Sequence, residues 1–532
     1  MTATLAIYPS HDANITFKSK EGIYRVFEIE RLTKKRYDSL LLVSNPKEIY
    51  QQVYDLIIKE FGDVNFNICY TLQLPQDHKD MVASIFGDMV FEDVGHHYSH
   101  AACAFYQSSF DESLIISFDG GGFDGGEGDE RVTFFNIYLG KRANGIEKLI
   151  SFPYNLGTAY GLLAVPISEI IKTEEDWGDK FLSFAGKKMG LCAYGNIREE
   201  WIEPLITFYK EHKHGDLTDF AKSLKNKLGQ PLRVNNWSAQ DSYDLAASSQ
   251  EAFERTAMHL IEPYLEQYSN LPVVLTGGCA LNVLFNQKLK DKISRDIFIP
   301  PNPSNCGLSF GMIAYHERPA NQIDLTYAGI PLLDLDKLPE LVKFHSATPW
   351  SIQSLANNLT RSRMIIGIAH GRSEHGPRAL GNRSILCDPR YVNMKNDLNT
   401  KVKFREWYRP FAPVCRLEDV EKYFHFSGES RFMTYSPEVR EEWRNKIPAI
   451  VHKDNTARVQ TVTHDQNALL YDLLTEVEKI TGIGILLNTS FNIKGRPILS
   501  TCEDAISVLL DTKIHRVIVD DYLFGDNFEP WC

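Results

Sequence analysis

Residues 371–390, which read GRSEHGPRALGNRSILCDPR, set the strongest limit on the fold of this chain. They hold four arginines and three glycines. The apolar run 364–369 directly before them is typical of a buried strand. A strand that opens into such a loop presents backbone N–H groups and guanidinium forks, which match phosphate and carboxylate oxygens. This pattern favours an α/β fold with an anion site, while a loop held by salt bridges is the alternative for any single arginine.

Further basic and amide side chains follow between apolar segments, mainly in the motifs KVKFREWYRPFAP, NTARVQTV and LLNTSFN. The chain as a whole is acidic, with a net charge of −12, so this basic character is local. A net negative charge disfavours binding to polymeric nucleic acid but is compatible with a nucleotide or a small anion. The residues predicted for the anion site are Arg372, Arg378, Arg383, Arg390, Lys401, Lys403, Arg405, Arg409, Arg458, Asn488, Ser490 and Asn492.

A second kind of site is predicted in the N-terminal half, within HHYSHAACAFY. The small residues after His100 favour a helix, on which His96 and His100 share one face. This is a two-ligand spacing for a metal. Asp119, at the end of the expected strand 113–118, is a natural third ligand. Residues 119–126, DGGGFDGG, are expected to form a glycine-rich loop that approaches a phosphate, with a hairpin turn as the alternative.

Three other segments contribute candidates. Gly277 and Gly278 follow the expected strand 271–276 and precede a helix, an arrangement that offers N–H groups to a phosphate. Residues 184–191 are expected to form a loop that carries Lys187. His11 follows the expected strand 4–8, where a turn-capping role is the interpretation that the residues alone favour.

Two lobes are expected on either side of a Pro-containing connector at residues 317–345. The nine cysteines form no CxxC pair, which favours reduced thiols and a cytoplasmic location. The N-terminus lacks the features of a signal peptide, and no stretch approaches the roughly 18 apolar residues of a membrane span. Oligomerisation is left open.

Seven motifs carry a resemblance to a known family: HHYSHAACAFY, SFDGGG, LTGGCALN, SEHGPRALGNRSILCDPR, KFREWYRPFAPV, NTARVQTV and LLNTSFNIKGRPI. Together they resemble the O-carbamoyltransferases of the NodU/CmcH family over nearly the whole chain. The resemblance implies an N-terminal actin-like (ASKHA) duplicated domain, residues 1–330, similar to the tRNA threonylcarbamoyl-transfer ATPase. A C-terminal YrdC-like α/β domain that forms carbamoyl adenylate would occupy residues 345–532.

The resemblance also implies an ATP-dependent reaction. Carbamoyl phosphate and ATP would give carbamoyl adenylate and pyrophosphate, and a hydroxyl of a small-molecule acceptor would then displace AMP. The implied catalytic residues are Arg378, Lys403, Arg409 and Arg458 for the first step, and His11 as general base for the second. The implied metal ligands are His96, His100, Asp119 and Asn305. The cofactor-binding set is Lys187, Gly277, Gly278, Asn282, Arg383, Asn488 and Ser490.

Iron(II) is the metal implied for the actin-like domain, and Mg²⁺ would accompany ATP. Asn305 stands where the family has an Asp, so it can offer an amide oxygen but no charge, and the metal's identity is left open. His375 stands where an apolar residue is usual. The acceptor is also open among sugars, natural products and hydroxymethylated nucleotides.

Two other functions were weighed against this one. A sugar or nucleoside kinase of the actin-like superfamily does not need the arginine-rich second lobe. A nucleotide-binding regulator without catalysis does not need the retained histidines and arginines.

Overall fold

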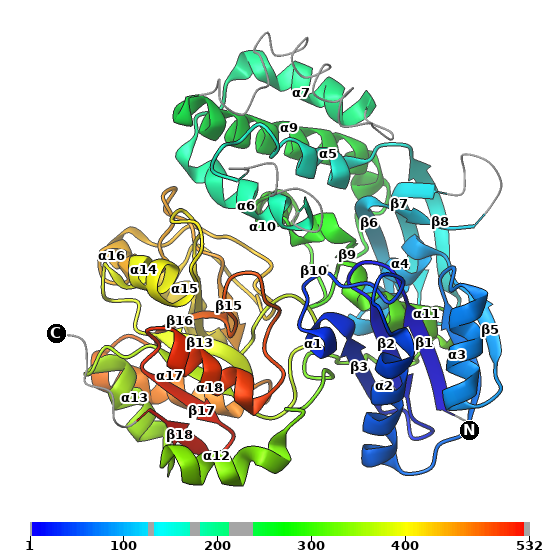
Figure 1. Ribbon diagram of the computed structural model, residues 1–532. Helices are drawn as coiled ribbons and strands as arrows, with labels where there is room; N and C mark the ends of the chain where they lie inside the picture. The colour runs from blue at the N-terminus through cyan, green and yellow to red at the C-terminus, as the bar shows by residue number, and fades with distance from the viewer. Residues whose placement is uncertain (1–2, 126–131, 171–180, 212–237, 526–532) are drawn as a thin grey trace. The chain divides into compact units, whose positions relative to one another are not determined.

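The computed structural model describes residues 3–125, 132–170, 181–211 and 238–525. Its contacts divide the chain into two compact units (Figure 1). The first comprises Met1–Ile23 and Ser39–Ile323, and the second comprises Tyr24–Asp38 and Asp324–Cys532. The segment Tyr24–Asp38 lies within the range predicted for the first domain, yet its contacts group it with the second unit.

Two five-stranded sheets form within the described part of the first 323 residues, and they share one topology. The strands of the first are β1 (Ala3–Tyr8), β2 (Asn14–Lys18), β3 (Tyr24–Glu28), β4 (Phe66–Thr71) and β5 (Val90–Asp93). Those of the second are β6 (Glu112–Phe123), β7 (Val132–Lys141), β8 (Gly145–Phe152), β9 (Val273–Thr276) and β10 (Ile297–Phe298). Their orders are β3-β2-β1-β4-β5 and β8-β7-β6-β9-β10. In each, the central strand is antiparallel to the next strand in sequence and parallel to the fourth.

Helices cover these sheets. Their bounds are α2 (Pro46–Phe61), α3 (Gln76–Phe86), α4 (His96–Gln107), α5 (Leu156–Leu162), α6 (Phe184–Leu191), α7 (Glu199–Glu211), α9 (Ala239–Gln267), α10 (Val283–Lys292) and α11 (Leu308–Glu317). Helices α4 and α11 pack against each other, with α11 on β1, β2 and β4 and α4 on β6, β7 and β9. Because α4 is enclosed in this way, almost all of its residues are buried, its three histidines included.

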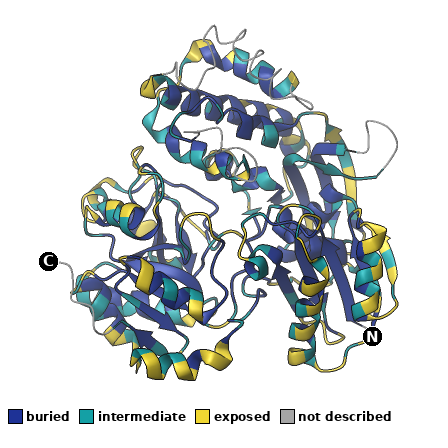
Figure 2. Ribbon diagram, in the orientation of Figure 1, coloured by how far each residue is buried: buried dark blue, intermediate teal, exposed yellow. Residues whose placement is uncertain are grey.

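The second unit is built on one mixed sheet. Its strands are β11 (Thr348–Pro349), β12 (Ile366–Ala369), β13 (Arg383–Cys387), β14 (Ala412–Arg416), β15 (Gln460–Val462), β16 (Ile485–Ser490), β17 (Arg516–Val519) and β18 (Tyr522–Phe524), in the order β11-β18-β17-β12-β13-β16-β14-β15. Its helices are α1 (Ile29–Thr33), α12 (Leu338–His345), α13 (Ile352–Thr360), α14 (Met394–Asp397), α15 (Val420–Tyr423), α16 (Glu441–Arg444), α17 (Ala468–Thr481) and α18 (Cys502–Asp511). Apolar residues of α13 and α17 close over β12, β13 and β16 to form the core, which is dark blue in Figure 2.

The predicted α/β class is confirmed, but some segments differ from expectation. Residues 119–123 are not a loop, because β6 continues to Phe123 after a register shift and pairs with β7 at Gly122 and Phe123. The expected loop at residues 184–191 is the helix α6, since its alanine, lysines, methionine and leucine outweigh its glycines. The expected connector contains the helix α12. Within the described ranges, no helix is long and apolar enough to span a bilayer.

Candidate functional sites

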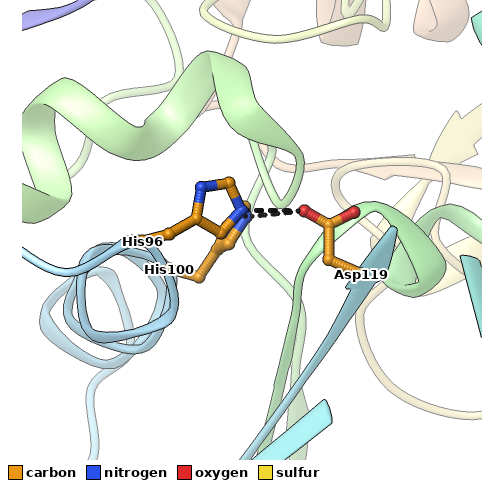
Figure 3. A group of neighbouring side chains, drawn as sticks. All are labelled: His96, His100 and Asp119. Atoms are coloured by element: carbon orange, nitrogen blue, oxygen red, sulfur yellow. Dashed lines mark hydrogen bonds and ion pairs between the residues drawn. The ribbon is translucent and has the colours of Figure 1, made fainter. Parts of the chain in front are cut away.

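Helix α4 and strand β6 bring three predicted metal ligands together. The Nε2 atoms of His96 and His100 lie 3.1 and 3.0 Å from Oδ2 of Asp119, and 3.2 Å from each other. Figure 3 shows both rings, one helical turn apart, directed at the same carboxylate. Among the His, Cys, Asp and Glu side chains of the described residues, this is the group of three whose ligand atoms lie within 4.8 Å of one another.

The spacing of these three atoms fits a shared cation. Ligands about 2.1 Å from a metal and about 90° apart are separated by about 3.0 Å. Burial lowers the pKa of His96, which favours the neutral imidazole that can coordinate a metal. Burial alone would raise the pKa of Asp119, but its interactions with His100 and His96 outweigh this effect and hold that pKa well below its usual range. Two imidazoles and a carboxylate are therefore available at one point.

The backbone around this group orients the carboxylate. Oδ1 of Asp119 accepts the N–H groups of Gly120 at 2.8 Å and Gly278 at 3.1 Å, so Oδ2 is left for the histidines. Gly122 lies against the ring of His96, where an added Cβ would come within 2.0 Å of Cγ. The predicted residue Gly278 thus contributes its N–H to the metal-type site. Its neighbour Gly277 has φ +87° and donates its N–H to Pro303 O at 2.8 Å.

His97 lies between the two ligand histidines in the sequence, and its hydrogen bonds support the site. Its ring nitrogens lie 2.8 Å from Ser117 Oγ and 3.1 Å from Thr133 O, and burial lowers its pKa to about 3. Its backbone N–H donates to Asp124 Oδ1 at 2.6 Å, and Asp124 also accepts the hydroxyl of Thr133. Sequence reasoning missed Asp124, although DGGGFDGG contains it.

His11 and Asn305 lie beside this group in the same unit. Asn305 Nδ2 is 3.1 Å from His11 Nε2 and donates to the Tyr8 hydroxyl at 2.8 Å. The Tyr8 ring is in turn edge-on to the ring of His96, with the centroids 6.3 Å apart. Burial lowers the pKa of His11, but Asp12 and Asp119 outweigh it and raise that pKa above its usual value. The amide nitrogen of Asn305 therefore faces His11 and Tyr8.

Two predicted nucleotide contacts have protein partners instead. Asn282 is the N-cap of α10, where its Oδ1 accepts the Phe285 N–H at 3.1 Å, and it pairs with Gln250 in both directions. Lys187 is half-buried, with its Nζ 5.8 Å from the Phe184 ring centroid. The next residue, Lys188, is the fully buried one: its Nζ donates to Ser249 Oγ at 2.9 Å, and burial lowers its pKa to about 7. Two adjacent lysines in a sequence do not reveal which of them faces inward.

The predicted anion site in the second unit is a cluster of cations. Burial and, to a smaller extent, the charge of Arg409 lower the pKa of Arg378 to about 10. Burial, with the charges of Arg378, Arg405 and Arg409, holds the pKa of Arg458 well below its usual range. Within the described residues, the guanidiniums of Arg378 and Arg458 make no hydrogen bond or ion pair, and Arg458 Nε is buried without a partner. Arg409, by contrast, has Glu406 Oε2 3.7 Å from its Nη1, so its charge has a carboxylate partner, whereas the charges of Arg378 and Arg458 have none among the described residues.

Lys403 is held in this cluster by neutral oxygens. Its ammonium donates to Ser490 O at 2.6 Å and Asn492 O at 2.8 Å, and to the side chains of both residues. Arg405 donates to Asn399 Oδ1 at 2.7 Å. Burial holds the pKa of Lys403 well below its usual range, and the charges of Arg405 and Arg409 add to this effect. The predicted residue Ser490 therefore positions a cation.

The other arginines of residues 371–390 have structural partners. The guanidinium of Arg383 is fully buried and donates to the carbonyls of His370 at 2.8 Å and Gly371 at 2.8 Å. Arg390 pairs with the carboxylate of Asp388 at 2.6 Å, and Arg372 Nε donates to Gly329 O at 2.8 Å. Asn488 donates to Gln460 Oε1 at 2.7 Å and to Ala379 O at 3.2 Å. Nη1 and Nη2 of Arg383 and the amide nitrogen of Asn488, both residues predicted to contact the cofactor, are thus engaged within the protein, while Nε of Arg383 is buried without a partner among the described residues.

Comparison with known proteins identifies the family. Residues 47–313 match the model described as the carbamoyltransferase N-terminus, and residues 356–525 match the carbamoyltransferase C-terminus. Nodulation protein NolO of Bradyrhizobium diazoefficiens is 33% identical over 457 residues, which cover 81% of this chain and 78% of NolO. Nodulation protein NolNO of Sinorhizobium fredii is also 33% identical over 457 residues, which cover 81% of this chain and 63% of NolNO.

Among solved structures, full-length HypF in its phosphate- and nucleotide-bound form has a TM-score of 0.36 at 13% identity, and covers 60% of this chain and 55% of HypF. This likeness is too weak to place any residue. The two family models and the relatives at 33% identity are sufficient without it. This chain is an enzyme of the carbamoyltransferase family.

Proposed function

We propose that the chain is an ATP-dependent O-carbamoyltransferase that works in two steps. In the first, one water enters, a carbamoyl oxygen becomes bonded to the α-phosphorus of ATP, pyrophosphate leaves ATP, and carbamoyl phosphate loses its own phosphoryl group as phosphate. In the second, the hydroxyl oxygen of a small-molecule acceptor attacks the carbamoyl carbon, and AMP leaves. The acceptor's proton passes to a base.

The observation that carries this proposal is a set of cations without carboxylate partners in the second unit. Arg378, Arg458 and Lys403 are partly or fully buried without a carboxylate partner among the described residues. Holding such charges together is unfavourable unless an anion is present. A bound polyphosphate would supply that anion, and fixed cations around it would stabilise the negative charge that develops on the leaving pyrophosphate. Step one is therefore assigned to the second unit.

The first unit offers the groups for step two. Because His11 Nε2 accepts from the Asn305 amide, its Nδ1 carries the proton and points to Asp12, 3.3 Å away. The acceptor's hydroxyl would replace Asn305 as the donor to Nε2 and lose its proton there. Asp12 would then stabilise the imidazolium that forms.

The donor set formed by His96, His100 and Asp119 fits a divalent transition metal, and a pair of imidazoles with one carboxylate suits iron(II). Such a metal, when bound, supplies positive charge that polarises a carbonyl or phosphoryl oxygen. The repeated strand order of the two five-stranded sheets supports an actin-like, duplicated first unit. The role of the second unit as the YrdC-like domain rests on its cation cluster.

The purified chain should release pyrophosphate only when both carbamoyl phosphate and ATP are present. Acetyl phosphate in place of carbamoyl phosphate is the control, and it should give background release. Formation of ADP on addition of a sugar or nucleoside would point instead to a kinase. No turnover of ATP with carbamoyl phosphate would overturn the proposal. A panel of hydroxyl compounds, screened by mass spectrometry for the gain of one carbamoyl group, would identify the acceptor.

A further inference from the structure

The segment Tyr24–Asp38 carries an arginine that neither the motifs nor the mechanism above uses. We propose that Arg36 is a further anion-binding residue of the second unit, and that it contacts the same polyphosphate as Arg378 and Lys403. This inference rests on the proposed function, because that function supplies the anion. It adds a residue from the N-terminal part of the sequence to a site otherwise built from residues 378–492.

Contacts within the second unit hold this segment against the arginine-rich loop. Arg31, in α1, donates from Nη2 to Gly376 O at 3.0 Å, two residues before Arg378. The hydroxyl of Ser500 donates to Arg31 O at 2.7 Å. The position of α1 is thus fixed relative to the loop that presents Arg378.

After α1, the backbone makes a constrained turn that contains Arg36. Lys34 has φ +59° and Tyr37 has φ +58°, in the left-handed region that residues other than glycine rarely adopt. Such conformations persist where surrounding contacts enforce them, and they cluster at functional sites. Here the Tyr37 N–H donates to Glu30 Oε2 at 3.0 Å. The Arg36 guanidinium lies over the Tyr37 ring at 4.5 Å from its centroid and donates to the Tyr37 hydroxyl at 2.6 Å.

The charge of Arg36 acts on the cation cluster directly. It lowers the pKa of both Arg378 and Lys403, so it lies close enough to interact with each. Within the described residues, Arg36 makes no ion pair with a carboxylate. The preceding lysines differ, since Lys34 pairs with Asp504 at 2.9 Å and Lys35 with Asp38 at 3.6 Å. Arg36 therefore retains guanidinium donors for a ligand, beside two other cations that require one.

The test measures the affinity of the full chain for pyrophosphate by calorimetry at one fixed salt concentration. Arg36→Gln removes the charge and should weaken binding about tenfold, the loss expected for a charge-assisted hydrogen bond. Lys34→Gln is the matched control: it removes the same charge two residues away and should leave the affinity within about twofold. Arg36→Met, which keeps the stacked aliphatic chain, is a second variant and should lose as much as Arg36→Gln. Measurements are made well below the melting temperature of each variant.

Each outcome decides the proposal. Loss of affinity in both Arg36 variants, with the Lys34 variant unchanged, supports it, because a residue that only held the turn would alter melting rather than affinity. Wild-type affinity in either Arg36 variant overturns it and leaves the proposed function standing. If the wild-type chain binds no pyrophosphate, the proposed first step and the role of Arg36 fail together.

Discussion

The two candidate sites of this chain differ in how their charges are balanced. In the first unit, the carboxylate of Asp119 faces two imidazoles and two backbone N–H groups, so both of its oxygens have partners. In the second unit, Arg378 and Arg458 have no such partner within the described residues. The charge of the first site is therefore balanced by groups of the protein, whereas the charges of Arg378 and Arg458 in the second are not balanced within the described part of the chain.

This difference indicates which site tolerates the absence of its ligand. A carboxylate that accepts hydrogen bonds on both oxygens costs little to maintain, whereas clustered cations oppose folding. The second unit must offset that cost elsewhere, and its apolar core, where Ile366, Leu386 and Leu486 are fully buried, is the natural source. Loss of a ligand residue should therefore have opposite effects on stability in the two units.

The largest expected effect is in the first unit. His100→Ala removes one of three metal ligands and leaves Asp119 with one imidazole partner, so bound metal should fall from about one equivalent to background. Carbamoyl transfer should be lost with it. Pyrophosphate release should persist, because the second unit is unaltered. Elemental analysis of the variant and an assay of both half-reactions would measure this.

Full metal occupancy in the His100 variant would break the assignment of the triad. The matched control is His97→Ala, on the same helix. The ring of His97 bonds to Ser117 and Thr133 and not to Asp119. The His97→Ala variant should retain metal with reduced affinity, because loss of a residue that supports a metal ligand typically weakens metal binding about 10–100-fold.

In the second unit, Arg378→Ala should reverse this pattern. The loss of one fixed cation at a phosphoryl group is expected to slow pyrophosphate release by about 10²–10³-fold. Metal content should be unchanged. Arg372→Ala, in the same loop, is the control: its guanidinium donates to Gly329 O, so its effect should appear in stability rather than in chemistry. Equal pyrophosphate release by the Arg378 variant and the wild type would remove Arg378 from the site.

A loss of similar size, confined to the transfer step, is expected for His11→Asn. A positioned base typically contributes about 10²–10⁴-fold, so transfer to the acceptor should fall by about that factor while carbamoyl adenylate still forms. The base must be neutral, and the pKa of His11 is raised, so wild-type transfer should fall with decreasing pH through a pKa above the usual value for histidine. That dependence should vanish in the variant. If transfer and its pH profile survive in the variant, His11 is a turn residue.

Sequence reasoning placed the triad well because helix periodicity alone brings His96 and His100 to one face. It could not show that β6 continues through the glycines after Asp119, since pairing with β7 is a long-range interaction. It also could not separate Arg378 from Arg383. Both lie in one motif, and only the fold shows that Arg383 holds backbone carbonyls while Arg378 does not.

Arg36 was missed for a related reason. Arg36 follows Lys34 and Lys35, a run of basic residues that is typical of a solvated surface. It is more than 300 residues from Arg378 in the sequence. The first domain was expected to extend over residues 1–330, so a residue at this position was not considered for the second site. The grouping of Tyr24–Asp38 with the second unit is a tertiary property that no local pattern encodes.

The smallest expected effect tests the charge imbalance itself. Because the pKa of Arg458 is held below its usual value by burial and by neighbouring cations, the positive charge of this side chain opposes folding. Arg458→Gln should therefore stabilise the ligand-free chain by about 1 kcal/mol and raise its melting temperature, while it slows pyrophosphate release. Arg416→Gln is the control, since Arg416 donates to Asp419 at 2.7 Å and its loss should lower the melting temperature. Pyrophosphate should raise the melting temperature of the wild type more than that of the Arg458 variant. If Arg458→Gln melts at or below the wild-type temperature, the cation cluster is compensated in the folded chain, and the contrast between the two sites does not hold.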